Sequence, residues 1–146
     1  MGSKTGSKPK DLAARLRIDS AELASELCDQ PRLFFEANVR RVALTRERMN
    51  LELELKAARA DALLRLREEH PGSTVQVLDA YVSSDPVVRE LQARLADVEL
   101  REEESKVLVE AFRQRRECLS LLLDQNRAEI GLGGLRRRIE SKYPGR

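Results

Sequence analysis

Aromatic residues are what this sequence has least of. Its 146 residues include three Phe, two Tyr and no Trp, whereas 36% of them are charged. A single domain of this length usually relies on aromatic side chains to fill its core. Their scarcity argues against a bulky globular core and favours long helices rich in Leu, Val and Ala.

Residues that carry chemistry are also scarce. His70 is the single histidine, and Cys28 and Cys118 have neither metal-ligand spacing nor a disulfide framework. The glycine-rich "GLGG" at 131–134 has no preceding strand and no following Lys-Ser or Lys-Thr, so it is not a phosphate-binding loop. These absences argue against an enzyme, a metal site and a bound cofactor.

Long apolar runs are missing as well. No run approaches the roughly 20 residues of a membrane span, and the N-terminus lacks the apolar segment of a signal peptide. The two cysteines without a disulfide pattern are typical of a reducing compartment. We therefore expect a cytoplasmic protein that has no membrane partner.

Positive charge is concentrated at the two ends of the chain, although the net charge is only +2. Residues 1–10 contain three lysines, and residues 131–146 contain five basic residues against one glutamate, which leaves a net charge of −5 for residues 11–130. Such a charge separation suggests an anionic partner that approaches through particular basic patches.

Two long stretches have no internal Gly or Pro and carry apolar residues at alternating spacings of three and four. The first is predicted to start with Pro31 in its first turn and to end near His70, where "HPGST" breaks it. The strand-like alternation "LELEL" at 51–55 lies inside this stretch. Because the heptad pattern extends over many more residues, it is the stronger indication, and a strand is rejected. Both stretches are therefore predicted to be helices.

The second helix is predicted to start at "SSDP", with Ser84 as its N-cap and with Asp85 and Pro86 in its first turn. It is expected to run to about Ile130, where "GLGG" ends it. With a turn near residue 77, the two helices give an all-α fold. This fold is a long antiparallel, coiled-coil-like helical hairpin with short N- and C-terminal helices.

The remaining segments are shorter. Residues 1–10, "MGSKTGSKPK", have the composition of a disordered basic tail. Residues 11–130 form the hairpin domain, which opens with one or two short helices capped by Ser20. Residues 131–146 form a Gly hinge and a basic amphipathic C-terminal tail. The segment "VQVLDAYVS" at 75–83 is either helical or extended.

One apolar stripe on each long helix is expected to face the other helix. In the first helix this seam comprises Phe35, Val39, Val42, Arg46, Met49, Leu53, Lys56, Ala60, Leu63 and Arg67. In the second helix it comprises Leu91, Leu95, Val98, Glu102, Ser105, Val109, Phe112, Arg116, Leu119, Leu123, Asn126 and Ile130.

Each long helix also carries a second apolar stripe on its opposite face. In the first helix the members are Leu44, Leu51, Leu55, Ala58 and Ala62, and in the second they are Ala93, Ala96, Leu100, Val107, Ala111 and Cys118. A two-helix hairpin needs one seam, so the second stripes predict assembly into a homo-oligomer. The residues expected at its interfaces are Leu51, Leu55, Leu100, Val107, Leu122, Leu135 and Ile139.

Polar residues interrupt the predicted seams, and two interpretations of them stay open. In an antiparallel pair with its turn near residue 77, Lys56 lies opposite Glu99 and Glu102. Such residues usually fix register and oligomeric state at some cost in stability. The alternative is a functional polar site within the bundle.

Two groups of arginines are candidates for binding phosphate. Arg59, Arg65 and Arg67 lie near the end of the first helix, and Arg136, Arg137 and Arg138 lie in the C-terminal tail. Recognition of a phosphate backbone requires positive charges of this kind. Ordinary surface charge on a helix is the competing interpretation for both groups.

Several short stretches together resemble a known family. They are the N-terminal "DLAARLRIDSAELASE", the basic-x-basic pair before a Gly turn in "ALLRLREEHPG", the helix start "VSSDPVVRELQARL" and the helix end "LSLLLDQNRAEI". Over about residues 11–131 the layout resembles the UvsY-type recombination mediators of tailed phages.

The resemblance implies a non-enzymatic, oligomeric, helical protein of the host-cell cytoplasm that binds single-stranded DNA. Such mediators help a RecA-like recombinase to replace single-strand-binding protein and to form its filament. The family's DNA-contacting basic pair would correspond to Arg65 and Arg67, and its assembly region to the end of the second helix and the tail. The alternative is a structural coiled-coil or phage scaffolding protein that binds no nucleic acid.

Overall fold

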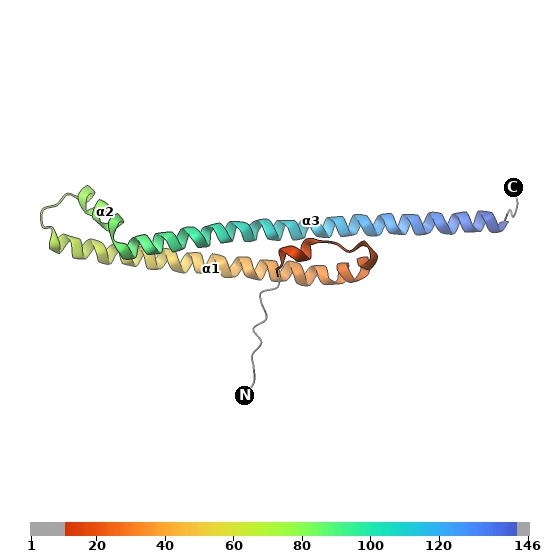
Figure 1. Ribbon diagram of the computed structural model, residues 1–146, viewed down its shortest axis with the longest axis horizontal. Coiled ribbons are helices and arrows are strands. Elements are labelled where there is room, and N and C mark those ends of the chain that lie inside the picture. The colour runs from red at the N-terminus through yellow and green to blue at the C-terminus, as the bar shows by residue number, and fades with distance from the viewer. Residues whose placement is uncertain (1–10, 143–146) are drawn as a thin grey trace, which may run out of the picture. The chain divides into compact units, whose positions relative to one another are not determined.

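The computed structural model describes residues 11–142, which are helical almost throughout and contain no strand (Figure 1). Two short 3₁₀ turns precede three α-helices: the turns are Ala13–Leu16 and Ser20–Glu22, and the helices are α1 (Leu23–Glu69), α2 (Val75–Ser84) and α3 (Pro86–Lys142). The all-α prediction is confirmed, and residues 75–83 belong to a helix. The expectations for residues 1–10 and for residues 143–146 of the predicted tail concern positions outside the described residues.

The chain divides into two compact units, and both long helices contribute to each of them. The hairpin unit is Asn38–Val107 and holds the second part of α1, all of α2 and the first part of α3. The terminal unit comprises the described residues 11–37 and 108–142.

In the hairpin unit, α1 and α3 lie side by side and run in opposite directions, with α2 in the connection between them (Figure 1). Ala62 of α1 packs with Val82 of α2 and Val88 of α3. Earlier in α1, Leu51 packs with residues further along α3, which confirms the antiparallel hairpin. The "LELEL" stretch is helical, as predicted.

The break after α1 is also confirmed, although the connection differs from a simple turn near residue 77. Gly72 has a φ of +92°, a conformation that side-chain-bearing residues rarely adopt. Thr74 then caps α2 by accepting a hydrogen bond from the Val77 N–H. Because α2 fills the connection, the register of α1 against α3 differs from the predicted one.

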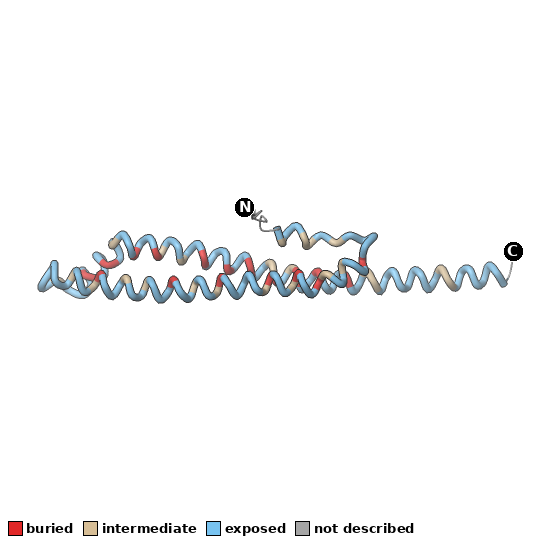
Figure 2. Tube along the Cα trace, turned by 90° about the horizontal axis from the view of Figure 1, so that it is seen from below, coloured by how far each residue is buried: buried red, intermediate tan, exposed pale blue. Residues whose placement is uncertain are grey.

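The terminal unit has its own small core. Leu33 and Ala37 of α1 pack with Val109 and Phe112 of α3, and Leu12 from the N-terminal turns covers them. From residue 120 to its end, α3 has no buried residue (Figure 2). This part of α3 is therefore held by its own backbone hydrogen bonds and side-chain pairs.

The predicted start of the first long helix is wrong. α1 begins at Leu23, so Pro31 lies inside it rather than in its first turn, at the cost of one backbone hydrogen bond. Ser20 is not an N-cap either. Asp19 caps the 3₁₀ turn instead, since its carboxylate accepts from the Ala21 N–H at 2.9 Å.

The N-cap of α3 is Asp85 rather than Ser84. The Asp85 carboxylate accepts hydrogen bonds from the N–H groups of Val87 at 2.9 Å and Val88 at 3.2 Å. Ser84 ends α2, and its hydroxyl donates back to the Ala80 carbonyl. Two consecutive helices thus meet at one capping carboxylate.

The prediction that "GLGG" ends the second helix is wrong, because α3 continues through Gly131–Gly134 to Lys142. A glycine ends a helix when it adopts a left-handed conformation, and among the described residues only Gly72 has a positive φ. The i,i+4 pair of Arg136 and Glu140 supports the helix beyond the glycines.

The stripe of α1 that packs is the one predicted to face away. Its buried or half-buried members are Leu44, Leu51, Leu55, Ala58 and Ala62. The predicted seam is instead exposed by 50–68% at five of its large apolar residues, which are Phe35, Val39, Val42, Met49 and Leu53. Its remaining large apolar member, Leu63, is half-buried and packs beside Ala62. On α3 the predicted seam is confirmed at Leu91, Val98, Val109, Phe112 and Leu119, all of which are buried.

This exchange of stripes corrects part of the predicted oligomer interface. Leu51 is 3% exposed, and Leu55 packs against the same core cluster, so the prediction that they face a second chain is wrong. The other candidates remain predictions: Leu100, Val107, Leu135 and Ile139 are exposed and Leu122 is half-buried.

Charge explains why this stripe packs. The predicted seam contains three cations, Arg46, Lys56 and Arg67, and burying them would remove three charges from water, which is costly even where a carboxylate lies opposite. The members of the stripe that packs are all Leu or Ala. Arg48, a cation one turn after Leu44, forms an ion pair with the Glu102 carboxylate.

Leu51→Ala and Leu53→Ala form a matched pair that tests the packing. Leu51→Ala should lower the free energy of unfolding by about 2–5 kcal/mol, because it leaves a cavity beside Leu91 and Val98. Leu53 is 68% exposed. Leu53→Ala should change the free energy by less than about 0.5 kcal/mol at concentrations where the chain is monomeric. Urea unfolding followed by circular dichroism measures both, and equal losses would contradict the observed packing.

Candidate nucleic-acid interface

The three arginines predicted near the end of the first helix all lie on α1 of the hairpin unit, and all are exposed. Arg65 is engaged, since its guanidinium forms an ion pair with the Asp85 carboxylate. Arg59 and Arg67 form no ion pair within residues 11–142. Two of the three cations are therefore available to an anionic ligand.

The Asp85 carboxylate has a structural role. The N–H groups of Val88 and Val87, and then the guanidinium of Arg65, lower the pKa of Asp85 below its ordinary value. The charged carboxylate thus caps α3 and anchors Arg65 at once. Arg65 connects α1 to the start of α3, a role that the sequence pattern does not reveal.

Arg59 lies in a shallow recess of about 350 Å³ between α1 and α2. Ala60 and Leu63 of α1 line it together with Asp79, Val82 and Ser83 of α2. The carboxylate of Asp79 makes this surface mixed in charge, which weakens its attraction for a phosphate relative to a purely basic patch.

A buried polar cluster lies in the middle of the hairpin unit. The side chain of Glu102 is 8% exposed, and it accepts hydrogen bonds from Thr45 Oγ1 at 2.7 Å and Arg48 Nε at 2.8 Å. Lys56 is exposed and does not reach Glu102, so the predicted pairing of these two residues is wrong. The shifted register brings Arg48 to the carboxylate instead.

These contacts keep Glu102 ionised. The Thr45 hydroxyl contributes most, followed by the Arg48 guanidinium, and together they hold the pKa of Glu102 below its ordinary value of 4.5. A buried carboxylate that is fully engaged by its own chain supports the register-fixing interpretation over a functional polar site.

A second buried polar cluster lies in the terminal unit. Arg115, with a side chain 2% exposed, forms an ion pair with Glu26 and donates to Gln30 Oε1 at 2.6 Å. Gln30 Nε2 in turn donates to the Phe112 carbonyl at 2.6 Å. Sequence reasoning assigned the seam position to Arg116 and missed Arg115, although Arg115 stands three residues after Phe112 and four before Leu119.

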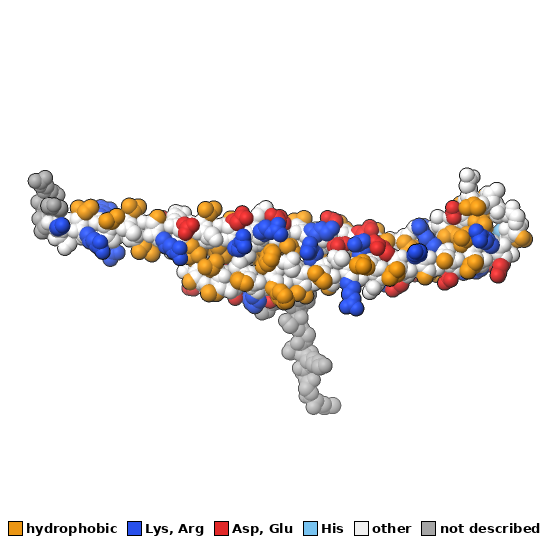
Figure 3. All heavy atoms as spheres, turned by 180° about the vertical axis from the view of Figure 1, so that it is seen from behind, with side chains coloured by type: hydrophobic (Ala, Val, Ile, Leu, Met, Phe, Trp, Pro, Cys, Tyr) orange, Lys and Arg blue, Asp and Glu red, His pale blue; other side chains and the backbone are white. Residues whose placement is uncertain are grey.

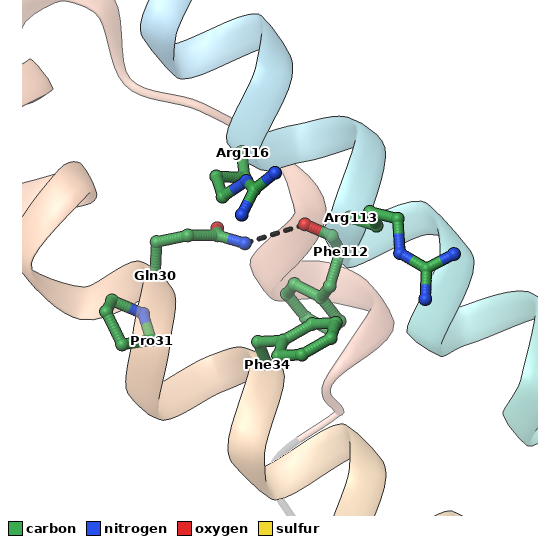
Figure 4. A pocket seen from close by; sticks show the side chains of 6 residues that line it. All are labelled: Gln30, Pro31, Phe34, Phe112, Arg113 and Arg116. Atoms are coloured by element: carbon green, nitrogen blue, oxygen red, sulfur yellow. Dashed lines mark hydrogen bonds between the residues drawn. The ribbon is translucent and has the colours of Figure 1, made fainter.

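Beside this cluster, the terminal unit has an apolar recess of about 270 Å³ (Figure 4). Pro31, Phe34 and Phe112 form its apolar part, and Arg113 and Arg116 border it. Arg113 pairs with Glu110 at 2.7 Å, whereas Arg116 forms no ion pair within the described part of the chain. The recess therefore combines an apolar lining with one guanidinium that forms no ion pair among the described residues.

The arginines of the predicted tail lie on α3. Arg136 pairs with Glu140 at 3.2 Å, Arg137 Nε donates to the Gly133 carbonyl at 3.4 Å, and Arg138 forms no ion pair among residues 11–142. Successive residues of a helix point about 100° apart. These arginines therefore surround the helix rather than form one basic face, and Figure 3 shows basic and hydrophobic side chains interspersed along this part of the molecule.

Two further kinds of site can be assessed within residues 11–142. No three acidic, cysteine or histidine side chains gather there in a way that could hold a metal ion. In the same residues, no helix combines the length and the apolar character that crossing a membrane requires.

The structure defines a class of helical-hairpin protein. Its buried polar side chains bond the two long helices to each other, and its unpaired arginines lie at the surface. Two crystal structures of the bacteriophage T4 recombination mediator protein UvsY share this fold. Their TM-scores are 0.72 and 0.69, and each is 17% identical to this chain. The matched region spans 81% of this chain in both comparisons, and it spans 92% and 95% of the two UvsY chains.

Neither a protein-family profile nor a curated protein matches the sequence. At 17% identity, the likeness to UvsY establishes a shared fold over most of both chains. The resemblance noted in the sequence is thereby confirmed at the level of the fold.

Glu102→Gln tests the buried polar cluster through its pH dependence. Because the pKa of Glu102 is lowered on folding, its contribution to stability is present above about pH 4.5 and is lost as the pH falls through the lower, folded-state pKa. The variant should unfold at less urea than the wild type at about pH 7, and this difference should shrink towards about pH 3.

Glu103→Gln is the matched control, because Glu103 is exposed and pairs only with Lys106 on the same helix. It should change the urea midpoint little at either pH, since exposed pairs of this kind contribute little. A Glu102→Gln difference that is independent of pH would contradict the assignment.

Proposed function

We propose that this chain is a recombination mediator that binds single-stranded DNA and helps to load a RecA-like recombinase in place of single-strand-binding protein. The observation that carries this proposal is the fold shared with the T4 recombination mediator protein UvsY over 81% of the chain. The role is non-enzymatic: the chain acts by binding DNA and partner proteins.

The free arginines support DNA as a partner. Arg59 and Arg67 are exposed and unpaired within the described residues, and Arg116 and Arg138 provide further free cations in the terminal unit. A single strand presents a phosphate at every nucleotide, so dispersed cations can each neutralise one. Arg65 contributes mainly by fixing the end of α1 through Asp85.

The exposed stripe of α1 supports assembly of several copies. Large apolar side chains recur on it at heptad spacing and remain 50–68% exposed in the single chain: Phe35, Val39, Val42, Met49 and Leu53. Large apolar side chains exposed at such regular spacing usually mark an interaction site. We assign it to a homo-oligomer, with Leu100 and Val107 of α3 as further candidates.

The same stripe favours one alternative function, a structural coiled-coil or phage scaffolding protein without nucleic-acid binding. The mixed charge around Arg59 and Asp79 fits this alternative as well. The two functions differ in whether single-stranded DNA binds, so a binding measurement decides between them.

DNA binding is tested by titrating a labelled single-stranded oligonucleotide at several salt concentrations. The wild type should bind with an affinity that falls as salt rises, because each neutralised phosphate releases counterions. Replacing Arg59 and Arg67 together by Ala should weaken binding and flatten the slope of log K against log salt by about 0.7 per lost phosphate contact.

The control replaces Arg101 and Lys106, two exposed cations of the hairpin unit that already pair with carboxylates, by Ala. It should leave most of the binding intact. Absence of oligonucleotide binding at low salt would refute the mediator function, and an equal loss in the control would refute the assignment to Arg59 and Arg67.

Assembly is tested by light scattering. Leu53→Glu should lower the molar mass towards that of a monomer, because it places a charge on the exposed stripe of α1. Val75→Glu is the control, since Val75 is 66% exposed but lies on α2 and not on the stripe of α1. A monomeric wild type at micromolar concentration would contradict the oligomer.

A further inference from the structure

The hairpin unit carries one exposed aromatic stack. The rings of His70, just after α1, and Tyr81, on α2, have centroids 5.1 Å apart and planes inclined by 19°. Tyr81 is 45% exposed, and His70 is exposed as well. Because each ring covers only one face of the other, outer ring surface remains open to solvent.

This stack lies on the same side of α1 as a free cation. The His70 N–H donates to the Leu66 carbonyl at 2.9 Å, which continues the helical turn to His70. Arg67 is three residues earlier, so the two side chains are neighbours on one face. Glu68 is two residues earlier and points to the opposite side.

The same reasoning applies to α2. Tyr81 shares its face with Val77 and Ser84, one turn away on either side, whereas Asp79 is about 200° around the helix. The surface around the stack therefore combines ring faces, a small polar group and the guanidinium of Arg67. Acids nearby along the chain are Glu69, next to His70, and Asp85, whose carboxylate is engaged by Arg65.

We propose that the Tyr81–His70 stack is a platform for a nucleobase of single-stranded DNA, with Arg67 binding an adjacent phosphate. This inference rests on the proposed function. Base stacking on an aromatic ring tolerates any sequence, because every base has a π-face. Only a single strand can present that face, since the bases of a duplex are already stacked on one another.

The contact with His70 fixes the orientation of the Tyr81 ring before DNA arrives. Less side-chain entropy is then lost on binding than with a freely rotating ring. A pair that served only to pack the helices would be expected within the core, where Leu78 and Val82 of the same helix are 4% and 7% exposed. The exposure of Tyr81 therefore distinguishes it from its buried neighbours.

The affinity of the full chain for a labelled single-stranded oligonucleotide tests the platform. Tyr81→Leu should weaken binding about 5- to 150-fold, which corresponds to the loss of one stacked base. The slope of log K against log salt should stay unchanged, because no phosphate contact is removed. Tyr81→Phe keeps the ring and should bind like the wild type, whereas Arg67→Ala should flatten the slope.

Fluorescence gives a direct signal of stacking. The chain has two tyrosines and no tryptophan. In a Tyr143→Phe variant, Tyr81 is therefore the single tyrosine, and its emission should be quenched when an oligothymidylate binds. A duplex of equal length should quench it much less.

Val77→Ala is the structural control, because Val77 lies one turn from Tyr81 and is 43% exposed. An affinity loss in this variant equal to that of Tyr81→Leu would overturn the platform, as would unchanged affinity in Tyr81→Leu, unquenched fluorescence or equal quenching by duplex. A wild type that binds no oligonucleotide would refute the proposed function itself. The failures of the two proposals are thus distinguishable.

Discussion

The buried carboxylate of Glu102 sets the register of the hairpin unit. A carboxylate between two helices is stable only where donors reach it, and Thr45 and Arg48 do so in one alignment of α1 against α3. Sliding one helix by a turn, about 5.4 Å, would leave the buried carboxylate without its donors and Arg48 with Glu52 of its own helix as its remaining ion-pair partner.

Within that unit, the features near the end of α1 follow from this register. Ala62 meets Val82 and Val88, and its small side chain lets α2 and α3 approach α1 closely. Arg65 then reaches Asp85, the cap of α3. α2 is held in the position that brings Tyr81 onto His70, so the proposed base platform depends on the packing below it.

The terminal unit also has buried polar side chains that bond α1 to α3, although the residues differ. Arg115, Glu26 and Gln30 form a buried network that ties α1 to α3, and Gln30 also bonds the Phe112 carbonyl. Polar layers of this type exclude alternative alignments that a purely apolar seam of Leu and Ala would tolerate. The arginines that remain unpaired lie at the surface, where a phosphate can reach them.

The sequence by itself determined the two long helices and the break between them, because apolar periodicity and the "HPGST" breaker are local properties. It misplaced their outer ends, since Pro31 and "GLGG" both lie inside helices. Only the tertiary structure decided which stripe of α1 is buried. Both stripes have the same period. The cations of the exposed stripe disfavour its burial, and the register that completes the choice depends on Glu102, 54 residues away from Arg48. Only the tertiary structure also revealed that Asp85 both caps α3 and pairs with Arg65, and that Tyr81 stacks on His70. Each of these pairs joins residues on or beside different helices, and only the register of the packed helices brings them together.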